Sequence, residues 1–247
     1  MNKLYLSALK NLLVAVLLTS ALFGVILLLK ISLTIDNTLL FSVIATISGV
    51  CYILTISNPK NYVGFYFGII SSAALGVQFA TLGSWDMCAL YFAVFIPFQY
   101  SAICHWKKKN VEDLDIQTSI PKFLSLNKRL FFLLIFILII IIDYIFASFY
   151  LNSYKNEPFF SSFLIKMVFA IMISSSILAN YLMIGKWLDS WIFWLIYSAF
   201  AMISAIIIEN SFNLLLFTFF LIINAISFSK WLKARKSAMV VTQLSEN

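Results

Sequence analysis

Charged side chains are scarce in this sequence of 247 residues: only 11% of them are Asp, Glu, Lys or Arg, whereas about 25% is usual in a soluble domain. Hydrophobic residues make up 62% of the chain. A water-soluble fold cannot cover so much apolar surface with so few charges. The sequence therefore predicts an all-α polytopic membrane protein whose apolar faces lie against a lipid bilayer.

Residue patterns for catalysis and for metal binding are missing as well. The one histidine, His105, precedes Trp106 and three lysines at the expected end of a helix, where histidine is usually an interfacial residue. The sequence holds no GxxxxGK[ST] motif for nucleotide phosphates, and no two acids are spaced within a span as metal ligands. We therefore expect no enzyme activity, no metal and no cofactor.

Cysteine is also rare. Cys51, Cys88 and Cys104 fall in three separate apolar runs and match no disulfide or zinc spacing, so we interpret them as small core residues. The net charge of +7 would suggest a nucleic-acid partner if the basic residues gathered on one solvated face. Here they flank apolar runs, so we expect the lipid bilayer as a partner and no nucleic acid.

Long apolar runs predict eight transmembrane helices, because about 20 apolar residues cross a bilayer. The first run, residues 11–29, also resembles a secretory signal, but it stays apolar past any plausible cleavage point, which favours retention. The expected parts are an extra N-terminal helix (1–36), a first three-helix repeat (37–106), a linker (107–129), a bridging helix (130–152), a second three-helix repeat (160–232) and a tail (233–247).

Two stretches that lie 125 positions apart indicate the repeat. Gln99 precedes Trp106 by seven residues, Asn224 precedes Trp231 by seven residues, and a basic cluster follows each tryptophan. Three helices reverse the direction of the chain across the membrane. One extra crossing, the bridging helix, is therefore needed to make the two repeats parallel, and the expected plan is 3+1+3 helices about an axis along the membrane normal.

Lysine and arginine are distributed unevenly between the two expected sides of the membrane. Fourteen of them lie on the side that holds both termini and the linker, and three lie on the other side. Because basic residues concentrate in cytoplasmic loops, we expect a multi-pass protein of the inner (plasma) membrane with both termini in the cytoplasm.

Two charged residues fall inside predicted spans. Asp143 lies about 20 Å from the cytoplasmic boundary in the bridging helix, and Lys166, near the start of the next helix, has nearly the same depth. Charges are costly in hydrocarbon and usually pair with one another or face a cavity. We favour a structural ion pair between them. Proton coupling through Asp143 is the alternative, although the bridging helix lies outside both repeats.

Neutral polar and aromatic side chains indicate the ligand site. Gln99, Asn224 and Trp194 all lie about 10 Å from the cytoplasmic boundary, and Trp191 and Tyr197 are three residues to either side of Trp194. Two amides beside an indole would bind a flat polar ring without burying a charge. The alternative assigns the tryptophans to the interfacial aromatic belt, which fits Trp191 well.

Several motifs resemble those of PnuC-type vitamin transporters. The first repeat contains the run Asn61–Gly68, the pair Trp85-Asp86, and Pro97-Phe-Gln99 through Trp106-Lys-Lys. The second contains Asp189-Ser-Trp191-Ile-Phe-Trp194. The resemblance covers roughly residues 38–235 and implies a 3+1+3 helix plan similar to that of the SWEET sugar transporters. It also implies that copies of the chain can form a homo-oligomer, a trimer.

The resemblance further implies facilitated diffusion of a vitamin or nucleoside-like molecule by rocking of two helix bundles. Nicotinamide riboside is the leading candidate, and thiamine, riboflavin and deoxynucleosides are alternatives within the family. Two alternatives belong to other classes: a membrane sensor that binds the same ligand, and a non-catalytic membrane subunit. A sensor would normally carry an output domain, and the predicted cytoplasmic parts of this sequence are short.

Overall fold

The computed structural model describes residues 3–28, 37–81, 85–112, 121–150, 159–207 and 211–245, and the regular elements in these ranges are all helices. Within them, eight helical segments are long and apolar enough to cross a membrane. The prediction of an all-α multi-pass protein with eight transmembrane helices is therefore confirmed.

The first four spans run from the N-terminus to the linker. They are formed by α1 (Lys3–Leu28), α2 (Asn37–Ile56), α3 (Gly64–Thr81), and a fourth span in three pieces, α4 (Trp85–Leu90), the π-helical turn η1 (Tyr91–Phe95) and α5 (Ile96–Glu112).

The π-helical turn interrupts a span that we expected to be one regular helix. The backbone N–H of Ile96 donates to Tyr91 O, five residues earlier. Pro97 follows directly and has no N–H, and in a regular α-helix its ring would meet the carbonyl of Ala93. The wider turn ahead of Pro97 relieves this conflict.

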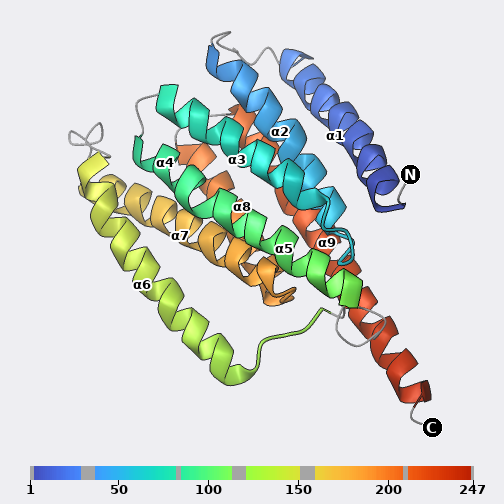
Figure 1. The fold of residues 1–247 in the computed structure, drawn as a ribbon. Helices are drawn as coiled ribbons and strands as arrows, with labels where there is room; N and C mark the ends of the chain where they lie inside the picture. The colour runs from blue at the N-terminus through green and yellow to red at the C-terminus, as the bar shows by residue number, and fades with distance from the viewer. Residues whose placement is uncertain are drawn as a thin grey trace.

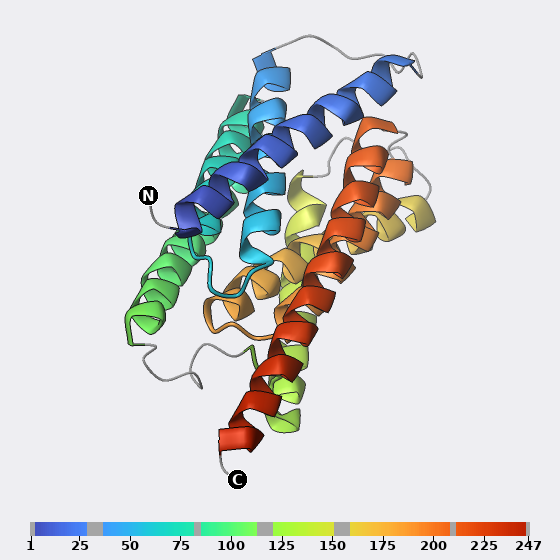
Figure 2. The ribbon, with the colours of Figure 1, turned by 90° about the vertical axis from the view of Figure 1, so that its right-hand side faces the viewer.

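The last four spans are regular helices: α6 (Leu126–Tyr150), α7 (Phe159–Ile184), α8 (Asp189–Ile207) and α9 (Ser211–Ser245). The last helix continues well past residue 232, where we expected the second repeat to end. Residues 233–239 are mostly good helix formers and include neither glycine nor proline. As a result, the C-terminal part of α9 projects beyond the other helices (Figures 1 and 2).

Two helices lie at the edges of the bundle (Figure 1). The first, α1, lies against α2, and α6 lies against α7 on the opposite edge. Both expose many large apolar side chains, as expected for surfaces that face lipid. Two bonds join α1 to the end of α2 and the following turn: Asn11 Nδ2 donates to Thr55 Oγ1 (3.2 Å), and Asn61 Nδ2 donates to Leu4 O (3.3 Å).

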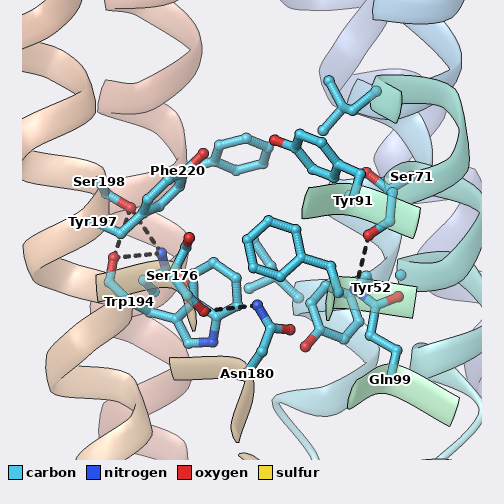
Figure 3. Close-up of a pocket in the computed structure, with 17 residues that line it drawn as sticks. Tyr52, Ser71, Tyr91, Gln99, Ser176, Asn180, Trp194, Tyr197, Ser198 and Phe220 are labelled. Atoms are coloured by element: carbon cyan, nitrogen blue, oxygen red, sulfur yellow. Dashed lines mark hydrogen bonds between the residues drawn. The ribbon is translucent and has the colours of Figure 1, made fainter. Parts of the chain in front are cut away.

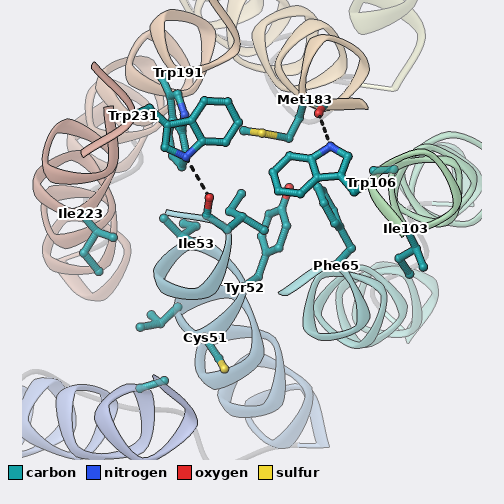
Figure 4. Packing of buried hydrophobic residues seen from close by; sticks show 14 of the residues in the cluster. Cys51, Tyr52, Ile53, Phe65, Ile103, Trp106, Met183, Trp191, Ile223 and Trp231 are labelled. Carbon is teal, nitrogen blue, oxygen red and sulfur yellow. Dashed lines mark hydrogen bonds between the residues drawn. The ribbon is translucent and has the colours of Figure 1, made fainter. Parts of the chain in front are cut away.

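Three fully buried tryptophans pack together at the end of the bundle where α2 and α7 end (Figure 4). We call this the tryptophan end. The ring centroid of Trp231 lies 5.8 Å from that of Trp106 and 5.5 Å from that of Trp191. Phe65 packs edge-on against Trp106 at 4.8 Å. The cluster thus fills the space between the helices α2–α5 and the helices α7–α9.

Two indole N–H groups bond across this cluster. Trp106 Nε1 on α5 donates to Met183 O on α7 (3.0 Å), and Trp231 Nε1 on α9 donates to Ile56 O on α2 (2.9 Å). Both acceptors lie in the last turn of a helix, where intrahelical partners run out. Each of the two groups of helices therefore supplies one donor and one acceptor to the other.

The second part of the predicted linker is bound to the turn between α7 and α8. Leu188 N donates to Lys122 O (2.9 Å). The carboxylate of Asp189, at the start of α8, accepts hydrogen bonds from Leu124 N and from Arg129 Nε, both at 2.8 Å. The side chain of Asp189 is only 6% exposed and that of Arg129 is 45% exposed. The ion pair therefore joins a buried carboxylate to a guanidinium at the surface, and it fixes the start of α6 against α8.

Candidate functional site

A cavity of about 110 Å³ lies between α2–α5 and α7–α9 (Figure 3). Gln99, which lines it, precedes Trp106 by seven residues, so the cavity lies about 10 Å from the tryptophan end. The described residues that line it include no charged side chain. Its aromatic and polar side chains are Tyr52, Tyr91, Phe95, Trp194, Tyr197, Phe220, Ser71, Ser72, Gln99, Ser176, Asn180, Ser198 and Asn224.

A second cavity, of about 330 Å³, adjoins the first and shares Tyr91, Tyr197 and Phe220 with it. It reaches Ser42 near the start of α2 and Gln78 near the end of α3, so it extends toward the end opposite the tryptophan end. The described residues around this cavity are likewise uncharged. The adjoining spaces together reach the size usual for small-molecule sites, roughly 300–1,000 Å³.

Gln99 on α5 lines the first cavity. Its Nε2 donates to Ser72 Oγ on α3 (3.1 Å), while Oε1 is buried and has no hydrogen-bond partner. A buried carbonyl oxygen without a partner costs about 1–3 kcal/mol. A ligand that brings a donor to Oε1 would offset this cost.

Asn224 on α9 has the same arrangement in the other group of helices. Its Nδ2 donates to Ser198 Oγ on α8 (2.9 Å) and, at 3.4 Å, to Trp194 O. Its Oδ1 is buried without a partner. Each amide thus donates within its own group of helices and leaves a buried carbonyl oxygen without a partner beside the cavity.

Trp194 supplies the largest flat surface of the cavity. Its ring packs edge-on against Tyr197 at 5.6 Å and against Tyr52 at 6.5 Å. The Nε1 of Trp194 and the hydroxyl of Tyr52 are buried and lack partners. The site therefore combines aromatic faces with an unused N–H donor, an unused hydroxyl and the two amide oxygens.

Four of the five predicted site residues, Gln99, Trp194, Tyr197 and Asn224, line this cavity. Trp191 does not line it. It is fully buried in the tryptophan cluster, with its ring against Trp231. It shares a helix face with Trp194 but lies one turn, about 5 Å, nearer the tryptophan end.

Sequence reasoning missed several residues of the cavity. Tyr52, Tyr91, Ser176 and Asn180 all line it, and Asn180 lies in its middle, with Nδ2 bonded to Ser176 O (2.9 Å) (Figure 3). Asn180 is the one amide side chain in α7. A polar side chain is costly in an apolar transmembrane helix and usually faces a cavity or a partner, so this position could have been predicted from the sequence.

Asp143 lies away from both cavities. Ser174 Oγ on α7 donates to Asp143 Oδ2 (2.8 Å), and this bond ties α6 to α7. Lys166 lies eight residues before Ser174 on α7, which corresponds to about 12 Å along the helix. The observed bond therefore sets Asp143 at a different level from Lys166, and the ion pair between them stays a prediction.

Eight spanning helices around an uncharged internal cavity define a multi-pass membrane protein with room for a small solute. Residues 39–233 match the family described as nicotinamide mononucleotide transporter, and the chain belongs to this family. No curated protein matches the chain. Among solved structures, a crystal structure of the vitamin B3 transporter PnuC has a similar fold, with a TM-score of 0.58, 15% sequence identity and 91% of each chain covered.

Family membership confirms three expectations from the sequence. The chain resembles PnuC-type proteins, it is a membrane transporter, and it is not an enzyme.

Proposed function

We propose that this protein carries a vitamin or nucleoside-like molecule across the inner (plasma) membrane by facilitated diffusion, with nicotinamide riboside as the leading candidate. The observation that carries the proposal is the uncharged cavity between the two groups of helices, lined by aromatic rings and by amide oxygens without partners.

The charge of the lining favours a nucleoside over the mononucleotide in the family's description. A phosphate monoester carries a charge of about −1.5 to −2 at neutral pH. Burying it is costly unless a cation or several N–H donors accompany it. The described residues around both cavities include no lysine, arginine or histidine. A ligand without phosphate therefore fits this site better.

The polar groups of nicotinamide riboside match those that the cavity leaves unused. Its carboxamide N–H₂ and ribose hydroxyls can donate to Gln99 Oε1 and Asn224 Oδ1, and its carbonyl oxygen can accept from Trp194 Nε1. Its ring is cationic, and attraction to the face of an indole contributes about 0.5–2 kcal/mol. Thiamine, which also has a cationic ring, remains an alternative on the same grounds.

Equivalent contacts support the 3+1+3 plan and rocking of the two bundles. The amides Gln99 and Asn224, which are 125 positions apart, bond serines that are 126 positions apart. The indoles Trp106 and Trp231, also 125 positions apart, bond backbone carbonyls of the opposite bundle. On this proposal α2–α5 and α7–α9 are the two repeats, α6 is the bridging helix, and rocking opens one end at a time.

The distribution of basic residues supports the orientation. The tryptophan end is the end to which the linker and the basic part of α9 belong, so on this proposal it faces the cytoplasm. The second cavity then extends from the site toward the outer side. The described conformation is accordingly one that is closed toward the cytoplasm.

Calorimetry with the purified protein tests the choice of ligand. Nicotinamide riboside should bind. Nicotinamide mononucleotide should bind at least about 100-fold more weakly, because its phosphate charge would be buried without a cation. Each factor of ten corresponds to about 1.4 kcal/mol. Equal binding of the two compounds would contradict the argument from the uncharged cavity.

Uptake into proteoliposomes tests transport itself. The riboside should enter vesicles down its concentration gradient without a proton gradient. Binding without uptake would favour the alternative of a membrane sensor.

A further inference from the structure

The two proposed repeats differ most in one pair of equivalent positions. Gly68 on α3 and Trp194 on α8 are 126 positions apart, the same offset as Ser72 and Ser198, and both line the first cavity. One repeat therefore has an indole where the other has no side chain at all. The amide side chains differ in the opposite direction: the repeat with glycine has the longer amide, Gln99, and the repeat with tryptophan has the shorter one, Asn224.

Gly68 lies directly against the amide group of Gln99. A Cβ atom added to Gly68 would be 2.9 Å from Cδ, 3.0 Å from Oε1 and 3.1 Å from Nε2 of Gln99. Three nearly equal distances mean that the flat amide faces the bare Cα of Gly68. The bond from Nε2 to Ser72, on the next turn of α3, holds the amide there and leaves Oε1 as the unused acceptor.

We propose that Gly68 is a positioning residue for ligand binding: its missing side chain lets Gln99 lie flat on α3 and present Oε1 to a hydrogen-bond donor of the ligand. This inference rests on the proposed function, because it assigns the ligand of that site a donor at the Gln99 wall. The size of residue 68 would then control how strongly the site prefers ligands that donate a hydrogen bond to Gln99 Oε1.

A methyl group on residue 68 should not disturb the packing of the helices, but it should displace the amide group of Gln99. The atoms nearest to the added Cβ all belong to the far end of the Gln99 side chain, not to backbone. That end can swing away at little cost to helix packing. Swinging away, however, moves Oε1 and breaks the bond to Ser72, so the acceptor is lost while the bundle stays intact.

The other repeat shows how a side chain at this position is accommodated. There Trp194 occupies the equivalent place, and the amide is the shorter Asn224, which still reaches Ser198 at 2.9 Å. A protein with a side chain at residue 68 should therefore tolerate asparagine at residue 99. Gln99→Asn is expected to be harmful alone but beneficial in the Gly68→Ala background.

The experiment is a double-mutant cycle measured by calorimetry. The wild type is first titrated with nicotinamide riboside, thiamine, riboflavin and deoxyadenosine, and the compound that binds is used for every variant. Gly68→Ala should weaken binding about three- to tenfold, as expected for one lost hydrogen bond, Gln99→Asn should weaken it by a smaller factor, and the double variant should bind more tightly than Gly68→Ala.

Gly24→Ala is the matched control. Gly24 lies in α1, and a Cβ added to it would have no heavy atom within 4 Å. It should leave ligand affinity unchanged and should not lower thermal stability. Gly68→Ala should also retain the thermal stability of the wild type, which separates a displaced acceptor from a disturbed fold.

Three results overturn the inference alone: wild-type affinity in Gly68→Ala, a double variant weaker than Gly68→Ala, or a Gly68→Ala protein that does not fold. Failure of the wild type to bind any of the four compounds overturns the proposed function and this inference with it. The two failures are therefore distinguishable.

Discussion

The helices α2–α5 and the helices α7–α9 make the same polar bonds with different side chains. In each group an amide donates to a serine beside the cavity, and an indole donates to a carbonyl of the other group. The two walls of the cavity differ. One wall has Gly68 and a long amide, and the other has Trp194 and a short one.

This comparison separates what supports the fold from what selects the ligand. The shared bonds join neighbouring helices, and both groups of helices make them. The differences lie on the walls of the cavity. On the proposed function, a ligand between these unlike walls would stack on one and bond to the other, and would therefore be held in one orientation.

The strongest test of the unlike walls is Trp194→Ala. Loss of the stacking surface and of its N–H donor should weaken ligand binding about tenfold or more, which corresponds to at least about 1.4 kcal/mol. Trp187→Ala is the control, because Trp187 lies in the turn before α8, near Lys128 Nζ, and does not line the cavity. Calorimetry on both variants decides: tighter binding by Trp194→Ala than by Trp187→Ala would place the site elsewhere.

The amides test whether both walls contact the ligand. Gln99→Ala and Asn224→Ala should each lower the uptake rate by about three- to tenfold, since each removes one hydrogen bond worth about 0.5–1.5 kcal/mol. The amount of folded protein, measured by size-exclusion chromatography, should not change. Impairment by only one of the two would show that the ligand bonds to one wall.

The indoles test the equivalence of the supporting bonds. Trp106→Phe and Trp231→Phe each keep a ring but remove the bond to Met183 O or Ile56 O. Each should lower the free energy of unfolding by more than about 1 kcal/mol, because the smaller ring also leaves a cavity at a fully buried position, and the two losses should be similar. Thermal unfolding in detergent measures the two losses, and a large difference between them would break the comparison.

Asp143 on α6 belongs to neither group of helices. Asp143→Asn weakens the bond from Ser174, and it should lower protein level or stability while uptake per molecule stays independent of the proton gradient. If a protonophore abolishes wild-type uptake and leaves the mutant unaffected, Asp143 is a coupling residue instead.

The smallest effect is expected from a cysteine in the projecting part of α9. Ser237→Cys should leave uptake unchanged, because Ser237 is exposed and lies beyond the basic cluster at the tryptophan end. If this end faces the cytoplasm, an impermeant thiol reagent should not label the cysteine in intact cells. Ready labelling would reverse the proposed orientation of the protein in the membrane.

Counting along helices predicted the helices and four residues that line the first cavity. The rise per residue is fixed, so the equal depths of Gln99, Asn224 and Trp194 followed from their distance to helix ends. Trp191 does not line the cavity with Trp194, because a shared helix face does not imply a shared level. Asn180 was missed, because the face that it turns inward depends on how α7 packs against the other helices.

Contacts between distant segments were beyond the reach of the sequence patterns. The bond of Asp143 to Ser174 and the binding of the linker by Asp189 depend on which helices become neighbours. The π-helical turn packs closely against Gly76 of α3, where an added Cβ would lie 2.6 Å from the ring of Phe92. Hydrophobic periodicity carries no information on such pairings.

The uncharged lining of the cavity has an electrical consequence. Nicotinamide riboside carries one positive charge, and no carboxylate among the described lining residues neutralises it. If this molecule is the substrate, each complete transport cycle moves its one positive charge across the membrane, and the uncharged lining assigns that movement to the loaded carrier and not to the return of the empty one. A potential of about 100 mV, negative inside, contributes about 2.3 kcal/mol to that movement. At equilibrium this corresponds to roughly fiftyfold accumulation in the cell, so the membrane voltage alone would concentrate the vitamin.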